Sequence, residues 1–543
     1  MISSELKFYI IKGLRFLGKR SEIKTAAMVS YAIVVANAVI SLLFTPFMLR
    51  SLSGNGAEYG LYQLLGATVS YLTVLDLGLA ETITKYVAKY RAENDQRGIE
   101  KLISTCMVIY TGIGVIIFAI GMAFFPFLGD VLTAIPEGYM AEARAMWIIL
   151  VVNLALMMPM NTFPAISNGF EKFTFPRTVN LVKLILRVGV WVLILITDDG
   201  YLPFGKAFFL LLSDTIMNVI AAGLKAWYVF GRLKVKVRRT KIEKGFVKEV
   251  FGFSVFVFIA AIADEIFWKI DYFILGSCLD NDLTQVNICS FSGNFVGYFR
   301  NFAGALSGSF LPRITRMVKN GARGKELTDI MTTVGRVQFI VLGLMLVGFT
   351  VVGRDFILRW TGDAIYSDAY IVGLIVLIPL TLALTQSAAG VSVLQATNKF
   401  SVRAIIMLIA AAGNVIVSVV LVKWLDIFNM GAIGAGIGTL LTTLGGHLIA
   451  LNIYYKKSCD INVKAYFLGM FKGLLPAMLV TLVVGFGVNM IPIWDVSYTS
   501  ILIRGIIIAV VYVITMLLFG LNEYEKGLFL TPVKRVFGKF ARR

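Results

Sequence analysis

The sequence predicts an all-α polytopic membrane protein of about fourteen transmembrane helices, in two six-helix lobes followed by two C-terminal helices. The chain is 58% hydrophobic and only 15% charged, with a mean hydropathy of +0.81, so it is far more apolar than a soluble domain. Apolar runs of roughly 20 residues recur along the whole length, each long enough to cross a ~30 Å hydrocarbon core as a helix. Unbroken runs such as 103–128 and 466–488 exclude barrel strands, which alternate polar and apolar residues.

The expected spans follow from the length that a membrane helix needs. They lie near 26–49, 60–83, 102–128, 145–167, 177–197, 203–230, 250–276, 284–312, 334–358, 366–392, 402–424, 430–455, 466–488 and 499–520. Before the first of them, residues 1–25 are basic with interleaved apolar side chains, which predicts an amphipathic helix on the cytoplasmic membrane surface and not a signal peptide. Pro159, Pro164 and Pro379 fall inside expected helices and predict kinks.

The charged residues alternate between the two sides of the membrane. Loops that this helix count places on the side of the N-terminus are basic, whereas the opposite loops carry acidic residues such as Asp199 and Asp282. The positive-inside rule therefore predicts that both termini are cytoplasmic. The formal net charge of +19 indicates orientation in a membrane and no nucleic-acid partner.

The longest basic linker divides the chain into its expected parts. These are the N-terminal lobe at 26–230, the linker at 231–249, the C-terminal lobe at 250–455, two further transmembrane helices within 456–520 and a basic cytoplasmic tail at 521–543. A segment ending in basic residues from Tyr71 recurs in outline from Tyr298, which is the pattern of transporters built from repeated halves.

Motifs for catalysis and cofactors are missing from the sequence. Four cysteines lie far apart, His447 is the single histidine, and no phosphate-binding loop, GxSxG or HExxH motif occurs. We therefore expect no cofactor and no metal site. The acidic turn at Asp280 and Asp282 has two interpretations, a metal-binding motif of a lipid-linked sugar transferase or a solvated turn, and its shortness favours the turn. "GAIGAGIG" from Gly431 predicts close helix packing.

The segment from Phe44 to Gln96 contains EYGLYQ, then LDLGL, then a basic run that begins at Lys85. It resembles the start of the polysaccharide-exporter flippases, the Wzx-like branch of the MOP superfamily, which also holds multidrug/toxin extruders and lipid II flippases. The resemblance implies a flippase of the bacterial inner membrane that carries polyprenyl-diphosphate-linked oligosaccharide to the outer leaflet by alternating access, for O-antigen, capsule or exopolysaccharide. The implied partners are this lipid-linked oligosaccharide, membrane lipids and the machinery that polymerises or exports the glycan.

Cations inside the expected helices are the candidates for substrate binding. An ionisable group at a helix centre costs about 2.5–3.5 kcal/mol on insertion scales, so it normally faces a bundle interior or a water-filled cavity. For Lys183 and Lys269, a cavity position and a structural ion pair are both open. Arg187 and Arg300 lie near the expected midplane without a partner on their own helix, which favours the cavity. Together the four would form a cationic cavity for the diphosphate.

Four carboxylates are candidate counter-ions or coupling groups, namely Asp76, Glu81, Asp264 and Glu265. Three interpretations of Asp76 and Glu81 remain open: pairing with bases across the lobe, holding the second helix against its neighbours, or exchanging a proton or cation during transport. For Glu265, the structural alternative is pairing with Lys269 one helical turn away.

Two other functions compete with the flippase. A small-molecule or cation extruder of the same superfamily would need a mainly anionic cavity, which the arginines oppose. A membrane glycosyltransferase or polymerase usually carries a large external loop with catalytic groups, whereas no loop here exceeds about twenty residues. We therefore expect a transporter and not an enzyme.

Overall fold

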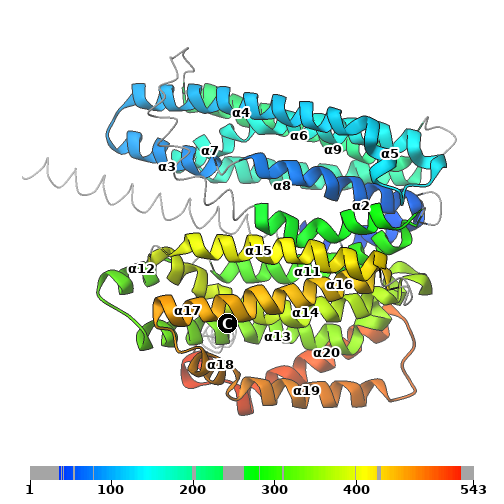
Figure 1. Cartoon of the computed structure of the whole chain (residues 1–543), viewed down its shortest axis with the longest axis vertical. Helices are drawn as coiled ribbons and strands as arrows, with labels where there is room; N and C mark the ends of the chain where they lie inside the picture. The colour runs from blue at the N-terminus through cyan, green and yellow to red at the C-terminus, as the bar shows by residue number, and fades with distance from the viewer. Residues whose placement is uncertain are drawn as a thin grey trace, which may run out of the picture. The chain divides into compact units, whose positions relative to one another are not determined.

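The computed structural model describes residues 36–52 apart from 38 and 41, 56–76, 79–197, 204–235, 262–280, 282–307, 311–397, 399–424 and 430–527. All regular elements in these ranges are helices, which confirms the all-α class (Figure 1). Within them, nine helices are long and apolar enough to cross a membrane, and one bent pair would make ten. The chain divides into two compact units, Met1–Glu265 with Leu279–Leu283 and Ile266–Cys278 with Thr284–Arg543.

Several of the fourteen expected spans are not among these membrane-length helices, and the reason can be given for each. Those near 26–49 and 250–276 lie partly outside the described residues. The span expected near 284–312 corresponds to α11 (Thr284–Ser307), which is less apolar because it carries Asn287, Asn294 and Arg300. Residues 1–25, most of the linker 231–249 and the tail from residue 528 also lie outside the described residues, so the predictions for them stay predictions.

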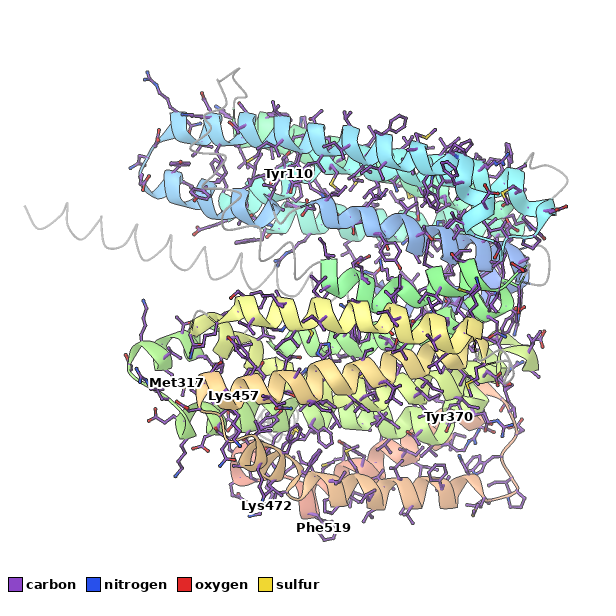
Figure 2. All side chains as sticks on the ribbon, viewed as in Figure 1. Tyr110, Met317, Tyr370, Lys457, Lys472 and Phe519 are labelled. Atoms are coloured by element: carbon purple, nitrogen blue, oxygen red, sulfur yellow. The ribbon has the colours of Figure 1, made fainter. Side chains whose placement is uncertain are left out.

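The first unit is a bundle in which α4 packs on α3 and α6, and α9 packs on α6 and α8. Its helices are α2 (Ala57–Ser70), η1 (Tyr71–Asp76), α3 (Leu79–Ala92), α4 (Gln96–Phe124), η2 (Phe125–Phe127), α5 (Leu128–Val131), η3 (Glu137–Tyr139), α6 (Met140–Met160), α7 (Thr162–Gly169), α8 (Thr174–Ile196), α9 (Lys206–Trp227) and η5 (Tyr228–Arg232). On α4, Tyr110 and Ile117 are fully buried while Val115 is 64% exposed (Figure 2). An apolar exposed face of this kind suits contact with lipid.

Two expected spans of the first unit are interrupted. The span near 60–83 is divided into α2, the 3₁₀ turn η1 and α3, and the interruption falls at Asp76 within the LDLGL motif. The span near 145–167 is divided at Asn161 into α6 and α7, directly after Pro159 and Met160. Both helices together form one apolar segment, Glu137–Gly169, long enough to cross a membrane.

The second unit is built around α14, which packs on α11, α13 and α16. It contains residues 266–278 of a helix at 262–278, then α11, α12 (Leu311–Lys319), α13 (Lys325–Thr361), η6 (Ala364–Tyr366), α14 (Asp368–Ala396), α15 (Phe400–Val419), η7 (Val420–Trp424), α16 (Gly431–Thr442), η9 (Thr443–Ala450), α17 (Leu451–Cys459), α18 (Val463–Phe471), α19 (Leu474–Asn489), α20 (Tyr498–Thr515) and η10 (Met516–Gly520). Close packing at Gly438 is confirmed, because a Cβ there would lie 3.1 Å from the Ser418 Cα.

The last helices are joined to α13 by a buried arginine. Arg336 is 6% exposed and donates to the carbonyl oxygens of Lys472 at 2.7 Å and Gly520 at 2.7 Å, and its Nε pairs with Glu525 at 2.5 Å. It thus satisfies carbonyl groups left open at two helix ends. Between α18 and α19 the chain bends by 43° at Lys472 and Gly473, where Gly473 has a φ of 78° (Figure 2).

Candidate functional site

One face of α8 is polar although the helix lies in an apolar bundle. Asn180, Lys183 and Arg187 are spaced three and four residues apart, so they lie along one face of the helix. Between them, Ile185 is 63% exposed and Leu186 is 59% exposed. The helix therefore presents apolar side chains outward and its cations toward the bundle.

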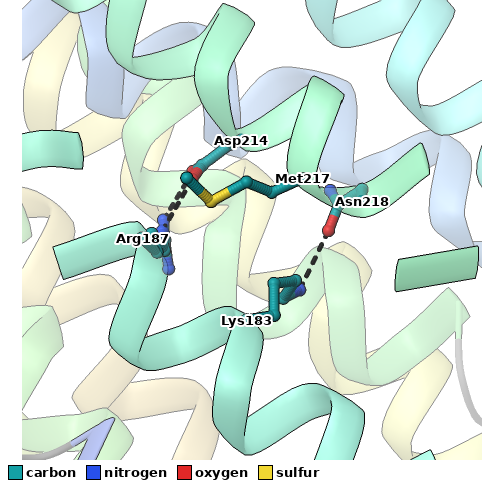
Figure 3. A pocket seen from close by; sticks show the side chains of 5 residues that line it. All are labelled: Lys183, Arg187, Asp214, Met217 and Asn218. Atoms are coloured by element: carbon teal, nitrogen blue, oxygen red, sulfur yellow. Dashed lines mark hydrogen bonds and ion pairs between the residues drawn. The ribbon is translucent and has the colours of Figure 1, made fainter. Parts of the chain in front are cut away.

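A matching polar face on α9 pairs with this one, as Figure 3 shows for two of the pairs. Because α8 and α9 run antiparallel, a residue near the end of α8 pairs with a residue near the start of α9, and the reverse also holds. Arg187 Nε and Nη2 donate to Asp214 Oδ1 and Oδ2 at 2.7 and 2.6 Å, and Lys183 Nζ donates to Asn218 Oδ1 at 2.9 Å. The third pair joins Lys225 Nζ to Asn180 Oδ1 at 2.8 Å.

These residues line a cavity of about 390 Å³ and an adjoining pocket of about 120 Å³. Lys183 and Arg187 line both spaces, Lys225 lines the larger, and Asp214 lines the smaller. The remaining polar groups of the larger cavity are amides. Its lining includes Asn37, Asn161, Asn180 and Asn218. The site thus holds three cations, one carboxylate and several neutral donors and acceptors, a composition suited to an anionic ligand.

The arginine in this site is paired, which the sequence did not indicate. Arg187 was expected to face a cavity because its own helix offers no partner, and its partner Asp214 lies on the next helix. The guanidinium also lies 4.0 Å from the ring centroid of Trp191, and the Tyr62 hydroxyl lies close to it. Arg187 therefore lines the cavity and forms an ion pair at the same time.

Arg300 lines a separate cavity of about 280 Å³ in the second unit. Arg403, Gln338 and Gln395 line it as well, together with two serines. The Arg300 guanidinium lies 4.8 Å from the ring centroid of Trp268 on the helix at 262–278. The prediction that Lys183, Arg187, Lys269 and Arg300 form a single cationic cavity stays a prediction.

The candidate carboxylates belong to two segments of the chain, Asp76 and Glu81 in one and Asp264 and Glu265 in the other. Asp76 lies at the end of η1 beside Tyr110 and Asn161, and its role stays a prediction. The side chain of Glu81 lies outside the described residues. Asp264, Glu265 and Lys269 are partly buried on the helix at 262–278.

Asp271, on the helix at 262–278, belongs to a network of neutral groups. Its carboxylate accepts hydrogen bonds from Thr439 at 2.8 Å and from Ser418 at 3.4 Å. Asn414 donates to the Phe267 carbonyl oxygen at 3.2 Å and accepts from Ser418 at 3.1 Å. Hydroxyl groups satisfy this carboxylate, so within the described ranges no cation pairs with it.

Sequence reasoning missed Asp214, Lys225 and Arg403. Asp214 is an ionisable residue inside an expected span, so the cost of burying charge would have singled it out. Lys225 and Arg403 lie near expected helix ends, where a cation ordinarily extends its charge to the interface. Nothing in the sequence separates such a lysine from one that turns into a cavity.

Comparison with solved structures finds the same fold in membrane transporters. The lipid II flippase MurJ in an inward closed conformation has a TM-score of 0.69 at 14% identity, covering 90% of this chain and 97% of that one. An inward-facing multidrug resistance MATE family transporter of the MOP superfamily has a TM-score of 0.54 at 12% identity, covering 78% and 100%. A Vibrio cholerae MATE transporter has a TM-score of 0.54 at 16% identity, covering 83% and 99%. The chain therefore has the fold of this superfamily.

Comparison with curated protein sequences gives no match. The profile of the family described as "Polysaccharide biosynthesis protein" matches residues 24–318, more than half of the 543-residue chain. This range includes the LDLGL segment and the paired faces of α8 and α9, and it confirms the resemblance drawn from residues 44–96. With many apolar helices of membrane-spanning length, the chain is a multi-pass membrane protein and belongs to the polysaccharide biosynthesis protein family.

Proposed function

We propose that this protein is a flippase that moves polyprenyl-diphosphate-linked oligosaccharide from the cytoplasmic to the outer leaflet of the bacterial inner membrane by alternating access. Its glycan would be a unit of O-antigen, capsule or exopolysaccharide. Family membership supports a role in polysaccharide biosynthesis, and the shared fold supports transport. The protein would work with membrane lipids around it and with the machinery that polymerises or exports the glycan, with both termini cytoplasmic.

The observation that carries this proposal is the cation-rich cavity of the first unit. Lys183 and Lys225 each donate to a neutral amide and not to a carboxylate. Their positive charges are therefore not neutralised by a direct ion pair, and an entering anion can gain from both. A diphosphate offers oxygens to both lysines and to Arg187, while the cavity amides can bind sugar hydroxyls.

The alternatives fit this cavity less well. An extruder of small cations would have to bind its cargo among Lys183, Arg187 and Lys225, with Asp214 already paired to Arg187. A glycosyltransferase or polymerase needs a general base or a metal-activated group near its acceptor. In the described part of the chain, no cluster of three histidine, cysteine, aspartate or glutamate side chains could hold a metal ion.

The cleanest test replaces Lys183 and Lys225 together by Gln. Each Gln amide can still donate to the Asn partner, so the pairing of α8 and α9 is kept while two charges are lost. Losing a contact to a charged group commonly costs about 1.5–3 kcal/mol, so we expect lipid-linked oligosaccharide to accumulate on the inner leaflet in cells. The measurements are leaflet-specific labelling of the lipid-linked glycan and the amount of protein in the membrane.

The matched control is Lys457→Gln, which removes an exposed cation outside both cavities (Figure 2). It should export glycan at the normal rate. Arg187→Gln and Arg300→Gln should each slow export, and Arg187→Lys should restore it only in part because lysine lacks the planar fork. Normal export by the double lysine variant at normal protein level would contradict the proposal.

A further inference from the structure

Asp214 occupies one of the two edges of Arg187 through which a phosphate group can bind with two hydrogen bonds. A guanidinium binds a carboxylate and a phosphate in the same way, through two parallel N–H bonds from one edge to two oxygens. Arg187 Nε and Nη2 make this double contact with the two oxygens of Asp214 at 2.7 and 2.6 Å (Figure 3). An anion seeking the same edge therefore has to replace the carboxylate.

The ion pair can be reached from the cavity. The Arg187 side chain is 32% exposed and the Asp214 side chain is 17% exposed, and both line the pocket of about 120 Å³ beside Lys183. A partly exposed ion pair is held less firmly than a fully buried one, because water and other charges compete for both partners.

Arg187 has a second support that does not depend on Asp214. Its guanidinium lies 4.0 Å from the ring centroid of Trp191, and that tryptophan is 7% exposed and packs near Phe44, with ring centroids 6.1 Å apart. A cation over an aromatic face is attracted by the ring. Arg187 can therefore stay in place while its carboxylate partner is exchanged.

We infer that Asp214 is an internal counter-ion that the diphosphate of the substrate displaces from Arg187, an inference that rests on the proposed function. The substrate-free site keeps its arginine neutralised, and the ion pair forms again when the substrate leaves. An internal competitor lowers the apparent affinity, because part of the binding free energy goes into freeing the arginine. Asp214 thus weakens binding of the diphosphate and favours its release.

The test is a titration of purified full-length protein with inorganic pyrophosphate, which presents the charged group without lipid or glycan. Asp214→Asn keeps an oxygen that accepts from Arg187 but removes the negative charge. We expect it to bind pyrophosphate about tenfold more tightly than the unmodified protein, a factor equivalent to about 1.4 kcal/mol. Asp214→Glu keeps the negative charge, so its affinity for pyrophosphate should be close to that of the unmodified protein. Asp214→Ser is a second neutral variant for the case in which Asp214→Asn does not fold.

A double-mutant comparison separates displacement from a general change in charge. In an Arg187→Gln background there is no ion pair to break, so adding Asp214→Asn should change the affinity by less than about twofold. If Asp214→Asn raised the affinity for pyrophosphate equally with Arg187 present and in the Arg187→Gln background, the effect would come from the overall charge of the cavity. That result would overturn the inference. Unchanged affinity of Asp214→Asn, in a protein that binds pyrophosphate, would overturn it while leaving the proposed function intact. If neither the unmodified protein nor Asp214→Asn binds pyrophosphate, the cavity proposed for the flippase fails as well.

Discussion

Gly438 of α16 has no room for a side chain. A Cβ at this position would lie 3.1 Å from both the Cα and the backbone nitrogen of Ser418. We expect Gly438→Ala to destabilise the protein by about 1–3 kcal/mol, the usual cost of overpacking, and to lower its unfolding temperature in detergent. Gly445, on the following π-helical turn, has nothing within 4 Å of its Cβ position. Gly445→Ala is therefore the control, and a drop of equal size there would contradict the packing argument.

At the scale of single residues, the sequence predicted which side chains would line a cavity. It did not predict the partners of those side chains. The spacing of Lys183 and Arg187 placed both on one face of a helix, and both line the cavity. Their partners Asn218 and Asp214 depend on how far α9 is shifted along α8, a shift set by packing between the helices. The periodicity of one helix holds no information on it.

At the scale of helices, Arg336 joins α13 to the last part of the chain. Glu525 is fully buried and pairs with Arg336, so Arg336→Gln would leave a buried carboxylate without its cation. Removing one partner of a buried ion pair costs about 3–5 kcal/mol, and we expect a corresponding fall in unfolding temperature. The exposed Arg323 supplies the control, because Arg323→Gln removes the same charge without a buried partner. Adding Glu525→Gln to Arg336→Gln should recover part of the loss; no recovery would mean that the carbonyl contacts alone hold these helices.

Helix ends and breaks were harder to predict than the presence of a helix. Averaged hydropathy locates a span because every apolar residue of the span lowers the free energy of insertion into lipid. A break depends on one or two residues, as at Gly473, whose φ of 78° suits a residue without a Cβ. The kink expected at Pro159 stays a prediction, and the 3₁₀ turn Tyr71–Asp76 has no comparable signal in the sequence.

At the scale of the whole molecule, the all-α membrane class followed from composition and from the length of the apolar runs, and both are averages over many residues. The candidate site could not be predicted to the same depth, because it rests on a few contacts between side chains of two different helices. Asn180 and Lys225 show this, since they pair at 2.8 Å across α8 and α9. Each alone is an ordinary polar residue of an apolar helix.

The orientation of the chain in the membrane is the prediction that tests the whole molecule. Because basic loops are retained on the cytoplasmic side, reporters fused after Lys241 and Lys319 should read cytoplasmic. Reporters fused after Asp199 and Asp282, in the acidic loops, should read external. The measurement is a paired alkaline phosphatase and green fluorescent protein fusion at each position, since one reporter is active outside and the other inside. An external signal after Lys241 would mean that the chain crosses the membrane an odd number of times before the linker. The division into two six-helix lobes would then be wrong.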